Sequence, residues 1–95
     1  MPAPDLRAAS RNAASVLSPA ASASFDDGLT LIVNARGRDD LARGLARVLC
    51  VWRAERDRVG IERERPLRRA VRDVCDHVAA CDRVAHDIAA NEAGA

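Results

Sequence analysis

Three cysteines and two histidines are the residues of this chain best suited to metal or redox chemistry. Four of them fall within twelve positions, as Cys75, His77, Cys81 and His86, and Cys50 lies far upstream. A zinc or redox site needs thiolates and imidazoles that converge on one point. Cys75 and Cys81 are six residues apart, about 120° around a helix. Only His77 and Cys81 would share a helix face, with Cys50 as a third ligand, so we expect core cysteines, no metal and no cofactor.

Motifs of the common enzyme classes are absent. The sequence contains no phosphate-binding glycine loop, no Gly-x-Ser-x-Gly, no His-Glu-x-x-His and no Cys-x-x-Cys. The acid pairs Asp26-Asp27 and Asp39-Asp40 have local explanations, as a turn and as a helix start. We therefore expect a protein that is not an enzyme.

The segment 53–72 is unusually rich in arginine. Every basic residue of the chain other than histidine is arginine, and eight arginines alternate here with four acids. The arginines are Arg53, Arg56, Arg58, Arg63, Arg65, Arg68, Arg69 and Arg72. Arginine near a helix start opposes the helix dipole, so a bound anion or an acidic partner would compensate. We predict that these side chains contact an acidic protein partner. The alternative is nucleic acid. Two features argue against nucleic acid: acids alternate with the arginines, and no aromatic residue is available to stack on bases.

The last of these arginines fall at the start of a predicted helix, whose apolar residues recur at regular spacing through the last third of the chain. The apolar residues follow steps of four and three, as in a coiled-coil seam. They are Leu67, Val71, Val74, Val78, Cys81, Ala85 and Ile88. Such a seam needs a second helix to cover it, and we expect its members to lie in the core or in an oligomer interface.

The segment 38–59 supplies the covering helix. Its apolar residues recur at helical spacing from Leu41 to Val59, and Trp52 lies on the same face as a core or interface anchor. Gly60 and Pro66 interrupt the pattern, so the expected fold is mainly α: an antiparallel helical hairpin of about 38–59 and 66–91. The register would bring Arg43 and Arg47 close to Asp82 and Asp87.

Upstream of residue 28 we expect a flexible, variable N-terminal arm, 1–27, with a short helix within residues 5–17 and a Ser/Ala linker after it. The domain would then span 28–95. Within it, residues 28–34 (GLTLIVN) alternate like a short strand. A lone strand needs a partner, from a second chain or from 59–64. Without one, the segment is an extended loop or part of a helix.

The stretch Leu29–Leu49 (LTLIVNARGRDDLARGLARVL) resembles the first strand and helix of an ACT-type regulatory domain, over about a fifth of the chain. Asp39-Asp40 stands where that family usually has Pro-Gly before the helix. The resemblance implies an α+β alternative with a βα(β) unit starting at residue 28, and with it a small-molecule sensor.

The size of the chain favours association. Its 95 residues suit one small domain, and twenty of its apolar residues are alanine, so a second chain would add burial. No signal sequence and no membrane-spanning stretch is apparent, which makes a cytoplasmic location the default. We therefore expect a small non-catalytic helical protein–protein interaction or assembly module, a homo-oligomer whose partner is selected by the arginine-rich hairpin tip. The alternative is a small nucleic-acid-binding regulator that uses the same arginines.

Overall fold

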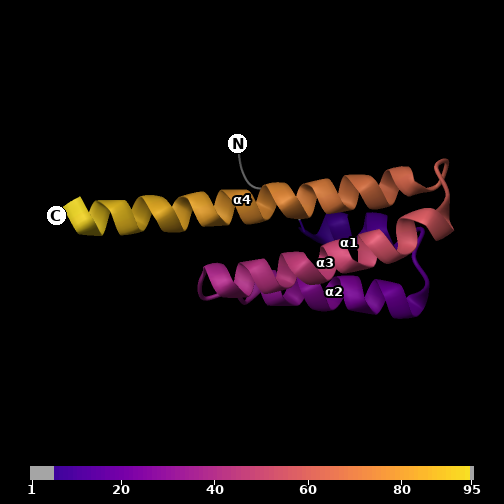
Figure 1. Cartoon of the computed structure of the whole chain (residues 1–95), viewed down its shortest axis with the longest axis horizontal. Helices are drawn as coiled ribbons and strands as arrows, with labels where there is room; N and C mark the ends of the chain where they lie inside the picture. Colours follow the sequence, from indigo (N-terminus) through magenta and orange to yellow (C-terminus); the bar gives the residue numbers. More distant parts are fainter. Residues whose placement is uncertain (1–5, 95) are drawn as a thin grey trace.

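The computed structural model describes residues 6–94, with side chains from residue 6 to residue 83, and there the chain forms four helices and no strand. They are α1 (Leu6–Ala14), α2 (Pro19–Val33), α3 (Arg38–Val59) and α4 (Glu64–Gly94). The prediction of a mainly helical protein is confirmed. Successive helices run in opposite directions (Figure 1). Because α1 and α3 each pack against both α2 and α4, the arrangement is an up-down-up-down four-helix bundle.

The predicted strand at 28–34 is wrong, and so is the alternative βα(β) unit starting at residue 28. Residues 28–33 form the last turns of α2, and Asn34 is the residue that caps its end. Phe25, Leu29 and Ile32 recur at helical spacing and are buried, whereas the alternating residues that suggested a strand include the exposed Val33. A helix satisfies its own backbone hydrogen bonds, which a lone strand cannot do.

The start of α2 falls within the segment predicted to be a linker. The Ser18 side chain accepts a hydrogen bond from the backbone N–H of Ala21 at 3.3 Å, and Pro19 takes the first helical position. This pair is a strong helix-start signal, because serine satisfies a free N–H and proline has none to satisfy. Residues 19–27 are therefore helical.

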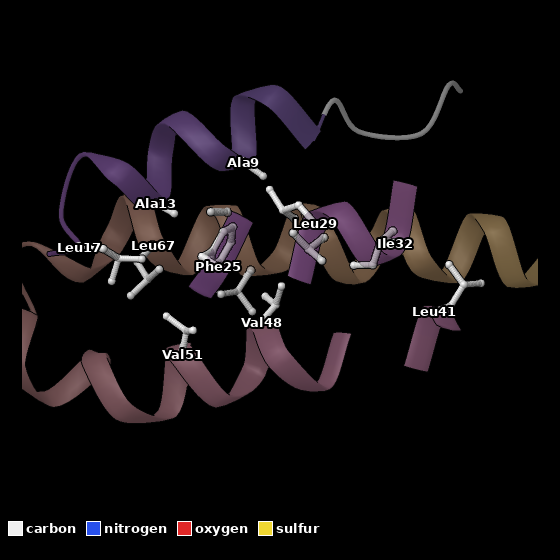
Figure 2. Packing of buried hydrophobic residues seen from close by; sticks show 13 residues of the cluster. Ala9, Ala13, Leu17, Phe25, Leu29, Ile32, Leu41, Val48, Val51 and Leu67 are labelled. Atoms are coloured by element: carbon white, nitrogen blue, oxygen red, sulfur yellow. The ribbon is translucent and has the colours of Figure 1, made fainter. Parts of the chain in front are cut away.

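The core lies between all four helices (Figure 2). Its largest fully buried side chains are Phe25 from α2, Val48 from α3, and Leu67 and Val74 from α4. Ala9 and Ala13 of α1 are also fully buried, so alanine lets this short helix approach the others closely. Residues 6–27 thus share one core with the rest of the chain.

The longest helix, α4, continues past the bundle. The guanidinium of Arg38, at the start of α3, donates to both carboxylate oxygens of Asp82, with Nε–Oδ1 at 2.6 Å and Nη2–Oδ2 at 3.2 Å. Asp82 therefore pairs with Arg38, not with Arg43 or Arg47, and this contact marks the level at which α3 begins. Beyond it, the backbone of α4 projects as a helix to Gly94 (Figure 1), a length of about 18 Å at 1.5 Å per residue.

Candidate interaction surfaces

The segment 53–72, here called the Arg-rich tip, forms one end of the bundle. It comprises the end of α3, the turn at 60–63 and the start of α4. Gly60 ends α3 with a φ of 83°, a conformation that glycine adopts without strain, and its carbonyl accepts the N–H of Glu64 at 2.9 Å. Pro66 falls in the first turn of α4, where its missing N–H is not needed.

All eight predicted arginines of the tip are exposed. Three form ion pairs with acids of the tip: Arg56 with Asp57 at 4.0 Å, Arg58 with Glu55 at 3.8 Å, and Arg68 with Glu64. The other five form no ion pair within the part of the chain that the structure describes. They are Arg53, Arg63, Arg65, Arg69 and Arg72. The tip thus presents guanidinium groups whose hydrogen-bond donors are free for a partner.

The two helix ends act on this charge in opposite ways. Arg56 and Arg58 lie in the last turn of α3, where the dipole favours cations. Arg65 lies in the first turn of α4, where the dipole opposes it, and Glu64 is the acid of that turn. Glu64 pairs with Arg68, and Arg65 forms no ion pair among the described residues. This is the charge that an acidic partner would relieve.

A groove runs along α2 and α3 beside the tip, and we call it the α2–α3 groove. Its volume is about 750 Å³. Alanines, Leu31 and Val51 line it, with Ser18, Ser24, Cys50 and Glu55 among them and Arg43, Arg47 and Arg58 as its cations. Arg47 pairs with Asp27 at 3.6 Å, while Arg58 belongs to both the groove and the tip. A ligand with an apolar face and acidic edges would match this surface.

The three cysteines have different surroundings. Within the described side chains, no three Cys, His, Asp or Glu residues converge to hold a metal ion. Cys50 is exposed, whereas Cys75 and Cys81 are partly buried against the core. Burial raises the pKa of the Cys75 thiol, and the neighbouring charge of Asp76 raises it further. The side chain of His86 lies outside the described residues.

The seam of α4 faces the core over its described length. Leu67 and Val74 are fully buried and Val71 is 8% exposed, whereas Val78 and Cys81 are only partly buried. Trp52 of α3 also packs against the core without being fully buried. The side chain of Ile88 lies outside the described residues. Burial of the seam is therefore complete at the tip and decreases toward Asp82.

A second hollow, here called the end notch, lies at the opposite end of the bundle from the tip. Residues from α2, the α2–α3 turn, α3 and α4 line a volume of about 440 Å³. They include Ile32, Val33, Leu41 and Cys81, with Arg36 and His77. Val33 is 67% exposed, the highest exposure of a large apolar side chain at this end among the described side chains. The notch therefore presents apolar surface to solvent.

The sequence patterns located the tip but not the groove or the notch. Both hollows depend on α2, which the alternating pattern of 29–33 concealed. The signal was present in Phe25, Gly28, Leu29 and Ile32, which recur at helical spacing behind the Ser18-Pro19 start.

Among the described residues, no helix combines the length and the apolar character needed to cross a bilayer. Comparisons of the chain with protein-family models, with curated proteins and with solved structures find no match. The case for a function therefore depends on the surfaces themselves.

Proposed function

We propose that this chain is a non-catalytic helical protein–protein interaction module that binds an acidic amphipathic helix. The Arg-rich tip selects the partner by charge, and the α2–α3 groove receives its apolar face. The observation that carries the proposal is the exposure of eight arginines at one end of the bundle, five of them without an ion pair in the described structure, beside a groove lined by small apolar residues.

Two physical features support an acidic helix as the partner. A helix laid in a groove presents apolar side chains three and four residues apart, and alanines in the groove allow its backbone to come close. Arginine binds carboxylates with two parallel hydrogen bonds, which makes it suited to selecting glutamate and aspartate at the edges. Arg58 adjoins both surfaces, so one partner could contact them together.

Nucleic acid is the competing ligand for the same arginines. Four acids within the tip reduce its charge, and the two aromatic residues of the chain, Phe25 and Trp52, pack into or against the core. Phe25 is therefore not placed to stack on bases, and Trp52 exposes only part of its ring, whereas single-stranded nucleic acid binders combine a cationic groove with exposed aromatic side chains. These features favour protein over nucleic acid.

The test is a binding titration with a designed peptide of about four helical turns, with leucine and alanine on one face and glutamate along both edges. A scrambled peptide of the same composition and a DNA duplex are titrated in parallel. We expect binding of the amphipathic peptide only, and at least about tenfold weaker binding to the R65E/R69E variant, since each exposed charge contact contributes up to about 1 kcal/mol. Neither arginine has an ion pair to lose in the described structure.

A charge-matched control is R36E/R83E, which removes two exposed arginines at the other end of the bundle. It should bind the peptide as the parent chain does. If the scrambled peptide bound equally well, the groove would be a non-specific cationic surface, and the proposal of a helix-binding groove would be wrong. Preference for the duplex would overturn the proposal in favour of a nucleic-acid-binding regulator.

A further inference from the structure

We propose that the end notch binds residues 84–94 of α4 from a second copy of this chain, in a reciprocal two-fold contact. This surface lies at the opposite end of the bundle from the Arg-rich tip, and the inference goes beyond the binding of an acidic helix. The dimer would account for two features that packing within one chain does not explain. One is the exposed apolar surface of the notch, and the other is the part of α4 that projects beyond its bundle.

The notch exists because α1 is shorter than the helices it packs against. Ser10 Oγ donates to Asp26 Oδ1 at 2.7 Å, which fixes the register of α1 against α2. In antiparallel helices with this register, Leu6 at the start of α1 lies level with about Thr30, one turn before α2 ends. Along that last turn of α2, no helix of the described chain occupies the position that α1 occupies elsewhere.

A helix that continues the position of α1 would run antiparallel to α4, as α1 does on the same side of the bundle (Figure 1). The projecting part of a second α4 has this direction when two molecules are related by a two-fold axis. Its sequence continues the seam at Ala85 and Ile88. About eleven residues of α4 project without packing on their own bundle, and most helical stability in proteins comes from packing, so a second chain would stabilise this part of the helix.

Charge at the notch agrees with this occupant. Residues 84–94 contain Asp87 and Glu92 and no arginine. Arg36, which lines the notch, is exposed, and its side chain forms no ion pair within the described residues; its backbone N–H donates to Asp40 at 3.0 Å. An acid of the incoming segment would pair with the Arg36 guanidinium, while Ile88 would bury against Val33 and Leu41.

The two-fold relation closes the assembly at a dimer. Each molecule inserts one segment into its partner and receives one in return, so the contact is isologous. The dimer therefore buries two identical copies of the notch contact. Val78 and Cys81, the least buried of the described seam residues, lie where the second helix would cover them. The seam of α4 would then be covered along its whole length, by its own bundle first and by the second copy beyond it.

The experiment is sedimentation equilibrium of the full chain over a range of concentrations, with helicity followed by circular dichroism. We expect a mass of twice 10.2 kDa for the parent chain. I88D should sediment as a monomer while keeping the bundle folded, since residue 88 lies beyond the Arg38–Asp82 level. V33D, from the receiving surface, should give the same result and guards against misfolding of the first variant.

The matched control is I61D, which makes the same change at a residue that is 85% exposed at the tip. I61D should remain dimeric, and so should R65E/R69E. Loss of peptide binding and loss of dimerisation can therefore be distinguished, because they arise from different variants. A monomeric parent chain, or a dimer that survives both I88D and V33D, would overturn the proposal.

Discussion

Gly28 of α2 and Gly44 of α3 face each other where the two helices cross, and neither position has room for a side chain. A Cβ added to Gly44 would lie 2.8 Å from the carbonyl oxygen of Gly28 and 2.6 Å from Cγ1 of Ile32. A Cβ added to Gly28 would lie 3.0 Å from the carbonyl oxygen of Gly44. The close contact between α2 and α3 therefore depends on both glycines.

The first prediction follows from this contact. Alanine has a higher helix propensity than glycine by about 1 kcal/mol. At Gly44, however, the methyl group meets backbone, and the two helices must separate to admit it, at a cost of about 1–3 kcal/mol. We expect G44A to lower the free energy of unfolding in urea, despite its better propensity.

Gly37 provides the control, because a Cβ there meets nothing within 4 Å and its φ of −174° is extended backbone. Because Gly37 is the N-cap of α3, where alanine is less favourable than glycine, G37A should lower stability by no more than about 1 kcal/mol. A G44A protein as stable as the parent chain would show that α2 and α3 are not held this closely.

The second prediction concerns Phe25, which is fully buried among α1, α3 and α4 (Figure 2). F25A should destabilise the protein by about 3–5 kcal/mol, since it leaves a cavity at the centre of the bundle. F25L, which keeps most of the volume, should cost less than about 1.5 kcal/mol. Trp52 is the only tryptophan and the chain has no tyrosine, so its fluorescence reports unfolding without interference. Equal losses for the two variants would contradict a packed core at Phe25.

The sequence predicted those elements whose helical period is strong and whose ends carry clear signals. Helix α3 spans the predicted 38–59, because Asp39 and Asp40 favour its start and Gly60 ends it. Helix α2 was missed because Leu29, Leu31 and Val33 alternate as in a strand. Over only five residues, this alternation also fits a helix in which some apolar residues are buried and Val33 is exposed. The local pattern favoured a strand here, whereas in the structure burial against α3 and α1 makes the segment a helix.

The sequence likewise predicted one of the three surfaces and missed the other two. The Arg-rich tip is contiguous in sequence, so counting charges located it. The groove and the notch each combine residues from separate helices, and no spacing rule brings Val33 and Cys81 together before the topology is known. The pairing of Asp82 with Arg38 instead of Arg43 has the same origin, since it depends on how far α4 slides along α3.

The third prediction concerns that pair. Asp82 raises the pKa of Arg38 above its ordinary value, through hydrogen bonding first and charge second. A raised arginine pKa affects stability only where free arginine would lose its proton, so the contact should be independent of pH throughout the neutral range. D82N should speed amide exchange in the second turn of α3, because the N–H groups of the first turn have no acceptor within the helix, and it should leave the tip unchanged.

Two variants control this result. D57N alters an exposed acid whose contact with Arg56 spans 4.0 Å, and it should leave exchange in α3 as it was. The double reversal R38D/D82R should restore slow exchange in that second turn. If D82N alone has no effect there, the Arg38–Asp82 contact does not hold the two helices together.

The last prediction uses the different environments of two cysteines. Burial and the charge of Asp76 raise the pKa of the Cys75 thiol, so a smaller fraction is thiolate near neutral pH, whereas Cys50 is exposed beside the α2–α3 groove. In variants that keep one cysteine each, iodoacetamide should modify Cys50 faster than Cys75, and the Cys75 rate should rise steeply as the pH increases. Mass spectrometry of the alkylated protein gives both rates. In denaturant the two rates should converge, because burial is lost; a Cys75 that reacts as fast as Cys50 in the native protein would mean that α4 does not pack against the core at this position.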